Sequence, residues 1–460
     1  MSSSGKNGRK FSRRSMLAGI GVGAAAFTIV PSHVLAGSGK TAPSDKLNMA
    51  CVGVSGRGGR DMNAVGRENI VALCDVDKGR LDKAGAKYKS AKTFRDFREM
   101  FDKMDKNIDA VTVGTPDHTH AVIALDAINR GKHVYCEKPL AHSIVEVRAL
   151  MNAARKNKVI TQLGNQGRSS AETRRLVEWV RDGAIGKVTE VHAACNAFKN
   201  VYCQLDKLPK LSERPKVPEG LDWNLWLGPV PETPYQPFYH PWNWRGWSAF
   251  GCGCLGDWAC HVMDPSFWAL DLDAPTSVQA EVDGFDPKTQ FATFPKGTKV
   301  TYKFPAKGNR GPVTLYWYDG NRSIPHPEAL EEKRRVPGTG AMLIGEGKGI
   351  SHGSHGAKGC RIFPEAAMQD YKKRLPAETI RRTKGHHEEW LEAIRENRPA
   401  DSDFSSGGPL TEISLLGVIA IRFAGKKLEW DSAKMTFTNC PEANKLVSPT
   451  FRSGWNPTGA

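Results

Sequence analysis

Short apolar runs alternate with amphipathic stretches between residues 47 and 163 of the chain. The apolar runs have the length of buried strands, whereas the stretches between them carry apolar residues at helical spacing. Strands and helices that alternate in this way predict one doubly wound parallel sheet. The predicted strands are residues 47–54, 70–74, 92–94, 109–114, a run that begins at 134, and 159–163, and the predicted helices are 60–67, 78–89, 96–103, 121–130 and 144–157.

The regular alternation of apolar runs and amphipathic stretches ends after residue 164, and this change of pattern predicts a second domain. We therefore divide the chain into a first domain at 46–165 and a second at 166–460. The segment 338–359 is rich in glycine and histidine and reads as a flexible loop, with a metal site at His352 and His355 as the less favoured alternative. The predicted elements of the second domain are helices 171–181, 386–394 and 410–423, strands 187–197 and 427–431, and strand-like alternation over 280–318.

The first 36 residues have the features of an export signal. Arg13 and Arg14 precede an uncharged segment rich in alanine and glycine, and small residues at 34–36 resemble a cleavage site. The apolar segment is too short and too rich in glycine to favour a membrane-spanning helix, and a retained anchor is the alternative. We predict a twin-arginine signal at 1–36, a linker at 37–45, and export of the folded protein to the periplasm, with membrane contact only during export.

The charge of the chain argues against a nucleic-acid partner. The net charge is +16, but five basic residues and no acid lie in the signal, which leaves +11 over the remaining 424 residues. No long basic block with interleaved aromatic residues occurs, so we expect no nucleic-acid binding. The ten cysteines are not spaced as a disulfide framework, and folding in a reducing compartment before export also argues against one.

A glycine-rich turn follows the first predicted strand and opens a helix. Backbone N–H groups of such a turn and of the helix N-terminus bind a pyrophosphate. Serine replaces glycine at the middle position of the fingerprint. The cofactor-binding candidates in this turn are Gly53, Ser55, Gly56, Arg57 and Gly58.

The second predicted strand ends at Asp75, 22 residues after Gly53. A carboxylate at this spacing reaches the ribose hydroxyls and repels a 2′-phosphate, so Asp75 favours NAD over NADP. A helix N-cap is the alternative role for Asp75, and Asp77 is a competing candidate.

Three further residues have the chemistry of proton transfer at a hydroxyl group. Lys138 follows a buried strand at the rim of the sheet, where a lysine can polarise a hydroxyl. The alternative is a surface lysine before a turn proline, without a functional role. Asp257 and His261 are four residues apart, so a helix places them on one face and the carboxylate can orient the imidazole as a general base. We predict no metal, because the nearby cysteines match no standard zinc site and the His386 region lacks a second zinc-binding histidine.

Five of the twelve tryptophans lie in the segment from Trp223 to Trp247. Aromatic faces with interspersed polar groups suit sugar rings, which makes Trp244 and Arg245 substrate-binding candidates. For any single tryptophan of this segment, packing within an irregular loop is the favoured interpretation.

With these motifs together, the chain resembles the glucose–fructose oxidoreductase, inositol dehydrogenase and rhizopine-catabolism (Gfo/Idh/MocA) family. The resemblance depends on the Gly53–Gly58 turn, Thr115-Pro116-Asp117-His118-Thr119-His120, Glu137-Lys138-Pro139 and the spacing Gly253-x3-Asp257-x3-His261. It implies a Rossmann domain followed by a domain with an open, mostly antiparallel sheet. It also implies a catalytic trio of Lys138, Asp257 and His261, and cofactor contacts from Thr115, His120, Glu137 and, by looser similarity, Gln166 and Arg168. We also take Arg168 as a substrate-binding candidate.

We expect hydride transfer at a ring carbon of a sugar substrate, and we expect a homo-oligomer. Because an exported protein has no pool of free NAD, the NAD should be tightly bound and recycled within each cycle. A redox-neutral, NAD-dependent enzyme that cleaves glycosides is the first alternative. A carbohydrate-binding protein without turnover is the second.

Overall fold

The structure is a computed structural model that describes residues 45–197 and 199–457. The predicted signal at 1–36 and most of the predicted linker at 37–45 lie outside these residues. From Leu47 onward the chain forms one compact unit, and that unit is described below.

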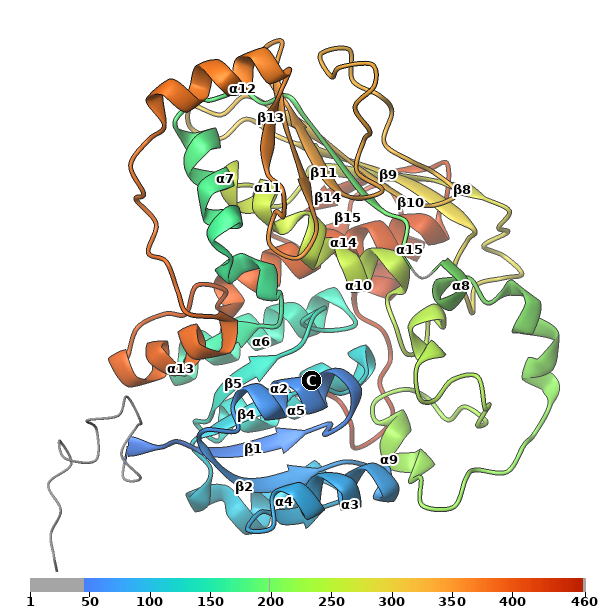
Figure 1. The fold of residues 1–460 in the computed structure, drawn as a ribbon. Helices are drawn as coiled ribbons and strands as arrows, with labels where there is room; N and C mark the ends of the chain where they lie inside the picture. Colours follow the sequence, from blue (N-terminus) through green and yellow to red (C-terminus); the bar gives the residue numbers. More distant parts are fainter. Residues whose placement is uncertain (1–44, 198, 458–460) are drawn as a thin grey trace, which may run out of the picture. The chain divides into compact units, whose positions relative to one another are not determined.

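A six-stranded parallel sheet forms the first half of this unit, as predicted (Figure 1). Its strand order, β3-β2-β1-β4-β5-β6, is that of a Rossmann fold. The strands are β1 (Asn48–Val52), β2 (Asn69–Cys74), β3 (Lys92–Phe94), β4 (Ala110–Val113), β5 (His133–Cys136) and β6 (Thr161–Leu163). The helices between them are α2 (Gly56–Ala64), α3 (Lys78–Lys87), α4 (Phe97–Met104), α5 (His120–Asn129) and α6 (Ile144–Asn157), with short 3-10 turns at Asp105–Asn107 and Asp117–Thr119.

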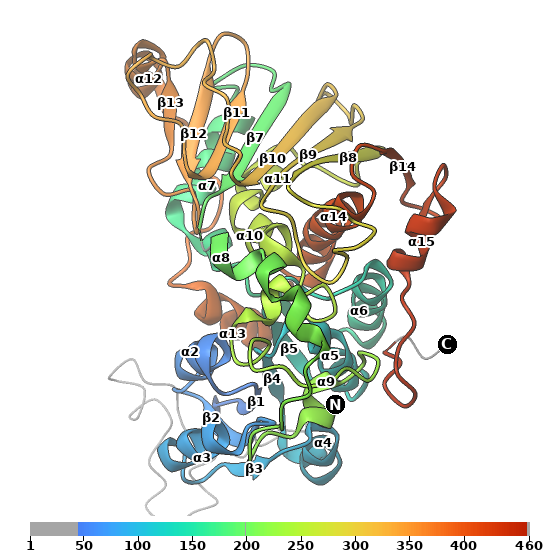
Figure 2. The same ribbon diagram turned by 90° about the vertical axis from the view of Figure 1, so that its right-hand side faces the viewer.

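A nine-stranded sheet forms the second half, and all its pairings are antiparallel except that between β7 and β10 (Figure 2). The predicted fold class is therefore confirmed for both sheets. The strand order is β13-β12-β11-β7-β10-β9-β8-β14-β15. The strands are β7 (Glu190–Cys195), β8 (Ser277–Asp283), β9 (Gly297–Phe304), β10 (Val313–Gly320), β11 (Thr339–Ile344), β12 (Gly349–Gly353), β13 (Arg361–Phe363), β14 (Lys427–Asp431) and β15 (Thr436–Phe437).

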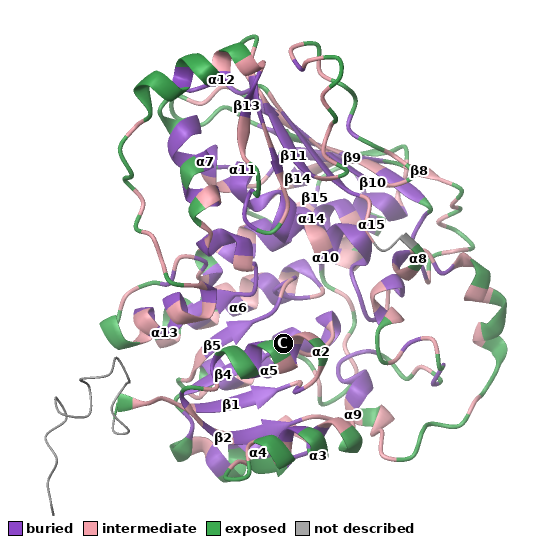
Figure 3. Ribbon diagram, viewed as in Figure 1, coloured by how far each residue is buried: buried purple, intermediate pink, exposed green. Residues whose placement is uncertain are grey.

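Two helices join the sheets. Helix α10 (Gly253–Val262) packs on β7 and on α14 (Phe404–Arg422), while α14 contacts β8 and β9 on one side and α6 and β6 on the other. Helix α14 is long and apolar enough to cross a membrane. Figure 3 shows, however, that it is largely buried, as expected for a core helix. The other helices are α7 (Ala171–Arg181), α8 (Lys199–Tyr202), α9 (Trp223–Leu227), α11 (Asp264–Ala269), α12 (Glu365–Tyr371), α13 (His386–Glu396) and α15 (Pro441–Val447), with 3-10 helices at Gln166–Ser169, Leu205–Ser212, Asn243–Gly246 and Lys372–Arg374.

Helix α13 lies late in the sequence but packs against the Rossmann sheet. Trp390 is fully buried in a cluster with Tyr135 of β5, and Leu163 N–H of β6 donates to Ser402 O at 2.8 Å. The chain after residue 385 therefore packs against both sheets. Residues that follow the predicted boundary at 165 thus also contribute to the packing of the Rossmann sheet.

The prediction of a flexible loop at 338–359 is wrong, because β11 and β12 form an antiparallel hairpin there. Its glycines allow close packing of backbone. A Cβ at Gly340 would lie 2.1 Å from His352 O, and one at Gly349 would lie 2.1 Å from the Phe363 ring. Glycine content alone does not distinguish such a strand from a loop.

Candidate active site

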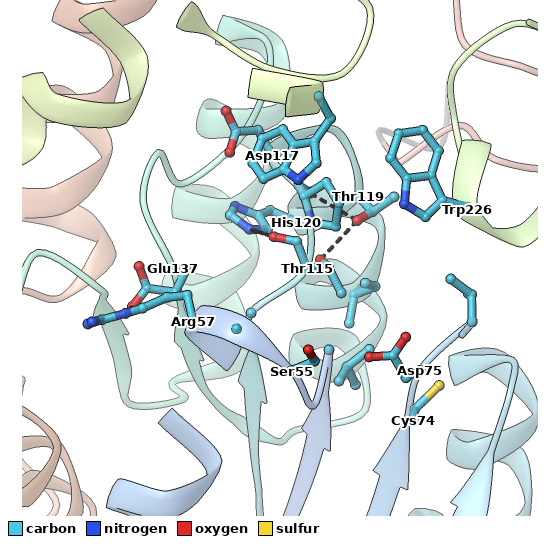
Figure 4. A pocket seen from close by; sticks show the side chains of 18 of the residues that line it. Ser55, Arg57, Cys74, Asp75, Thr115, Asp117, Thr119, His120, Glu137 and Trp226 are labelled. Carbon is cyan, nitrogen blue, oxygen red and sulfur yellow. Dashed lines mark hydrogen bonds and ion pairs between the residues drawn. The ribbon is translucent and has the colours of Figure 1, made fainter. Parts of the chain in front are cut away.

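A cleft opens at the carboxyl ends of the Rossmann strands and holds about 1130 Å³, part of it open to solvent (Figure 4). Ligands of open α/β sheets bind in this position. The predicted site residues that line the cleft are Gly53, Ser55, Gly56, Arg57, Asp75, Thr115, His120, Glu137, Lys138, Trp244 and Arg245. The predicted residues Gly58, Gln166, Arg168, Asp257 and His261 are not among the lining residues.

The turn after β1 brings backbone close to the cleft. A Cβ at Gly58 would lie 2.0 Å from Gly53 O, and one at Gly53, where φ is +79°, would lie 2.7 Å from Gly114 O. No side chain caps helix α2, so its first N–H groups are available to a ligand. Ser55 has φ −133° and ψ 165°, an extended conformation open to any side chain, so serine in place of glycine does not strain this turn.

Asp75 lies at the end of β2, where an acid can face a ribose. Its carboxylate accepts hydrogen bonds from Val54 N–H at 3.1 Å and from Asp77 N–H at 3.0 Å, and burial raises its pKa. Asp77, not Asp75, caps helix α3 by accepting from Arg80 N–H. The alternative role of Asp75 as an N-cap therefore does not apply.

The Glu137 carboxylate is fixed at the edge of the cleft by two side chains. Arg57 Nε and Gln166 Nε2 donate to Glu137 Oε1 at 2.9 and 2.7 Å. Gln166 Nε2 also lies 2.7 Å from the Tyr135 hydroxyl. Gln166 therefore sits behind the cleft and holds Glu137 in place.

His120 joins the turns after β4 and β5. Its ring nitrogens lie 2.8 Å from the carbonyl oxygens of Thr115 and Pro139. The Thr119 hydroxyl donates to the Thr115 hydroxyl at 2.9 Å, as Figure 4 shows. The His120 ring thus links the backbone at Pro139, next to Lys138, to the turn after β4.

Lys138 and Asp257 meet although 119 residues separate them in sequence. Lys138 Nζ donates to Asp257 O at 2.8 Å and forms an ion pair with the Asp257 carboxylate. The same carboxylate accepts from the Tyr202 hydroxyl and lies 3.4 Å from Arg245 Nε. Burial favours the protonated acid, but Lys138 and Arg245 hold the pKa of Asp257 well below its usual range, so Asp257 is ionised.

His261 lies on the same helix as Asp257, but the predicted contact between them is not formed. The Asp257 carboxylate turns to Lys138, Tyr202 and Arg245 instead. Within the described chain, His261 Nδ1 is buried without a hydrogen-bond partner. Burial, the Lys138 ammonium and the His355 ring lower the pKa of His261 well below its usual value, so the imidazole is neutral.

Asp117 lines the cleft and lies close to the charge of Asp257. It accepts from Cys252 N–H at 3.2 Å, and burial together with the nearby charge of Asp257 raises its pKa to about 7. At neutral pH Asp257 is therefore firmly ionised, whereas Asp117 is close to its midpoint.

The aromatic segment, residues 223–247, packs largely on itself, in agreement with the prediction that its tryptophans pack within an irregular loop. Trp226, Trp244 and Trp247 are buried in one cluster that also contains Phe250. Trp244 and Arg245 nevertheless line the cleft, and the Arg245 guanidinium lies 4.1 Å from the centre of the Trp244 ring and 4.2 Å from that of Trp242.

Arg168 does not face the cleft, contrary to its prediction as a substrate contact. It is buried, and its guanidinium donates to Asp264 Oδ1 and Ser406 Oγ, each at 2.6 Å. The ring of Trp268 lies 4.1 Å from the guanidinium. Arg168 thus ties the segment after β6 to helices α11 and α14.

Sequence reasoning missed Tyr202 and His355 as neighbours of the site. Tyr202 lies on the short helix α8 with no spacing that relates it to Asp257, and His355 lies in the segment predicted to be a loop. All ten cysteines are free thiols, and the described residues contain no cluster of histidine, cysteine and acidic side chains positioned to bind a metal.

The residues fit a dinucleotide. The α2 N-terminus offers uncapped N–H groups beside two close glycine contacts, which is where a pyrophosphate binds. Asp75 lies at the position for the ribose, and Lys138 and Glu137 lie at the far end of the same cleft.

Two family models match the chain. Residues 47–165 match the GFO_IDH_MocA model, described as an oxidoreductase family with an NAD-binding Rossmann fold, and residues 170–309 match the C-terminal alpha/beta domain of that family. Together the two matches cover more than half of the chain.

Curated relatives match over part of their length. Levoglucosan dehydrogenase of Pseudarthrobacter phenanthrenivorans is 29% identical over 170 residues, which are 37% of this chain and 34% of that protein. A glycosyl hydrolase family 109 protein of Solibacter usitatus is 32% identical over 205 residues, 41% of this chain and 46% of that protein. The chain thus spans between a third and a half of these relatives.

A solved structure shows the same fold. The WlbA dehydrogenase of Chromobacterium violaceum, in complex with NADH and UDP-GlcNAcA, superposes with a TM-score of 0.58 at 17% identity, over 84% of this chain and 97% of that one.

Proposed function

The chain belongs to the Gfo/Idh/MocA family of oxidoreductases and has its NAD-binding Rossmann domain, and we propose that it oxidises a ring carbon of a sugar or sugar derivative. NAD supplies the hydride acceptor when it is bound. The glycine turn would hold the pyrophosphate through backbone N–H groups, and the Asp75 carboxylate would accept hydrogen bonds from the ribose hydroxyls. The levoglucosan named for one relative supports a carbohydrate as the substrate class.

His261 is the proposed general base. Its neutral imidazole removes the proton from the hydroxyl of the reacting carbon, so that an O–H bond breaks and an N–H bond forms. Lys138 donates a hydrogen bond to the same oxygen and stabilises the negative charge that develops there. Asp257 is a positioning residue, because its ionised carboxylate holds the Lys138 ammonium in place. Trp244 and Arg245 offer an aromatic face and a donor to the sugar.

The observation that carries this proposal is the convergence of Lys138 with helix α10 beside the cofactor cleft. Lys138 binds Asp257, and its charge lowers the pKa of His261, which follows one turn later. A binding protein without turnover would not need an ionised acid that fixes a lysine beside a neutral imidazole.

A nucleotide in this cleft would be covered at its adenosine end. Trp455 from the C-terminal tail and Trp226 from the aromatic segment both line the cleft. Coverage of this kind favours slow release, which suits an exported enzyme that recycles its NAD.

Export through the twin-arginine signal at 1–36 and assembly into a homo-oligomer are further parts of the proposal. The replacement of Arg13 and Arg14 by lysine should abolish export, and size-exclusion chromatography with light scattering tests the assembly.

The decisive experiment identifies the small molecule that the purified protein carries. We expect denaturation to release NAD(H) in near-stoichiometric amount, detected by absorbance and mass. A panel of sugars should then change the nicotinamide absorbance of the bound cofactor. A protein without affinity for NAD(H) or NADP(H) would contradict the proposal.

Redox-neutral cleavage of a glycoside is the second candidate. In this scheme, transient oxidation at C3 acidifies the C2 proton, the substituent at C1 leaves, water adds, and the ketone is reduced again. The match to a glycosyl hydrolase family 109 protein supports this candidate. Release of an aglycone without net formation of NADH would select it over a simple dehydrogenase.

A further inference from the structure

A second imidazole lies against His261. His355 follows strand β12, and its ring is stacked on that of His261 with centroids 4.0 Å apart and planes 24° apart. The ring of Trp258 lies 5.1 Å from His355 at an interplanar angle of 81°. One end of the nine-stranded sheet thereby contributes a side chain to the site built on α10.

Packing holds the turn that carries His355. A Cβ at Gly167 would lie 2.4 Å from Gly356 N, and the Ser170 hydroxyl donates to Gly356 O at 2.7 Å. His355 itself has φ +51°, a left-handed conformation that is uncommon outside glycine and that persists only where the surroundings impose it. The position of the His355 ring is therefore built into the fold.

The chemistry of His355 is that of an available base. Partial desolvation and the nearby cations Lys138 and Arg57 lower its pKa, against the opposing charges of Asp257 and Glu137, so the exposed ring is neutral at pH 7. His355 Nδ1 lies 3.0 Å from the Ser354 hydroxyl. In the tautomer that donates from Nδ1 to this hydroxyl, Nε2 carries a free lone pair, since no described residue hydrogen-bonds to it.

We propose that His355 is a second general base, which removes the carbon-bound proton next to the oxidised ring carbon of the substrate. The inference rests on the proposed function, because that proton is acidic only when its neighbour is a ketone. Two neutral imidazoles side by side then serve two adjacent positions of one sugar ring. His261 takes the hydroxyl proton during oxidation, and His355 takes the proton from the next carbon.

The step balances without a further reactant. The C2–H bond breaks, its proton forms an N–H bond on His355, and its electron pair becomes an enolate whose oxygen accepts a hydrogen bond from Lys138. Without a leaving group the step reverses, and in D2O the carbon acquires deuterium. With a substituent at C1, the C3 ketone re-forms, the enolate electrons form the C1=C2 bond, and the substituent departs with its bonding pair. The substituent takes a proton from solvent, and His355 returns its own proton to solvent.

Proton exchange on a ketone that is supplied directly tests this step without any change in the cofactor. The probes are the 3-keto methyl glycosides of the gluco, galacto and manno series, incubated with the holoenzyme in D2O and followed by NMR at the C2 proton. We expect exchange with at least one probe well above the buffer rate.

Two substitutions separate a base from a merely stacked ring. His355→Phe keeps an aromatic face against His261, and His355→Asn suits the left-handed backbone. Each should lower the exchange rate by roughly 100-fold or more, the usual contribution of general base catalysis. Reduction of bound NAD by the sugar should change less than fivefold in both, and free imidazole should partly restore exchange in His355→Asn. His326→Phe, at an exposed histidine, is the matched control.

The outcomes distinguish the two proposals. A protein that carries no NAD(H) and reduces none contradicts the proposed function. A protein that transfers hydride but exchanges no C2 proton, or exchanges it equally well in both His355 variants, overturns only the role of His355.

Discussion

At the scale of single residues, Lys138 combines an ion pair with a proposed catalytic hydrogen bond. Lys138→Met should lower kcat by about 10² to 10⁴-fold, because no donor then faces the developing oxyanion. Affinity for NAD should change less than threefold, since the glycine turn and Asp75 bind the other end of the cofactor. Stopped-flow absorbance and equilibrium binding measure the two effects.

Lys132→Met is the control for Lys138→Met. Lys132 precedes the same strand and pairs with Asp105 at 3.2 Å, away from the cleft. Its loss should leave kcat unchanged, whereas full activity in Lys138→Met would exclude a chemical role for Lys138.

The pKa of His261 should determine the acid limb of the pH profile of kcat/KM. Burial, the Lys138 ammonium and His355 lower its pKa, and Arg57 and His386 act in the same direction. A lowered pKa keeps the base neutral as the pH falls, so kcat/KM should decline only well below pH 6.5, where an ordinary histidine is already protonated. A limb near pH 7 that disappears in Asp117→Asn would belong instead to Asp117, whose pKa is about 7. A limb at or above 6.5 that persists in this variant would contradict the role of His261.

The residue scale also shows what spacing can predict. The spacing of four residues correctly predicted that Asp257 and His261 lie one turn apart on a helix. The direction in which the Asp257 carboxylate points, however, depends on cations and hydroxyl groups from other segments of the chain. Lys138 and Tyr202 belong to segments 119 and 55 residues away. No local pattern encodes these partners, so the motif located the helix but assigned Asp257 to the wrong neighbour.

At the scale of elements, helix α13 is the link that local patterns could not place. Its periodicity predicts the helix, but its position against β5 and β6 depends on contacts across more than 200 residues, such as Trp390 Nε1 donating to Ile160 O at 3.3 Å. By contrast, the Rossmann strands were predictable, since each is a separate apolar run followed by its own helix. The hairpin of β11 and β12 was not, because its glycines serve close packing.

Trp390→Ala should destabilise the protein by about 3 to 5 kcal/mol, the usual effect of removing a buried tryptophan. Trp390 is fully buried and packs on Tyr135, whose hydroxyl contacts Gln166 beside Glu137. The urea midpoint should therefore fall, and NAD affinity should fall with it. Glu388→Ala, at a partly exposed position of the same helix, should change stability by less than about 0.5 kcal/mol. Equal effects of the two substitutions would show that α13 does not brace the cofactor domain.

At the scale of the whole molecule, two late segments of the second domain return to the Rossmann domain. Helix α13 packs against its sheet through Trp390 and Tyr135, and the tail after α15 lines the cleft through Trp455. Arg452 of this tail donates to Asn224 Oδ1 at 2.7 Å and Asn224 O at 2.8 Å, which ties the tail to helix α9. Trp455 then packs on Phe97, with ring centroids 6.1 Å apart, and Arg98 lies 4.2 Å from the Trp455 ring.

This closure predicts slow exchange of the cofactor. Trp455→Ala removes an aromatic wall of the cleft, and an aromatic contact of this kind contributes about 0.5 to 1.5 kcal/mol, so bound NADH should dissociate roughly threefold to tenfold faster. Arg452→Gln should act in the same direction by loosening the tail, whereas Thr450→Ala, at an exposed position of the same tail, should leave the rate unchanged. Displacement of NADH by excess NAD, followed by nicotinamide fluorescence, measures the rate. An unchanged rate in both Trp455→Ala and Arg452→Gln would mean that the tail does not retain the nucleotide.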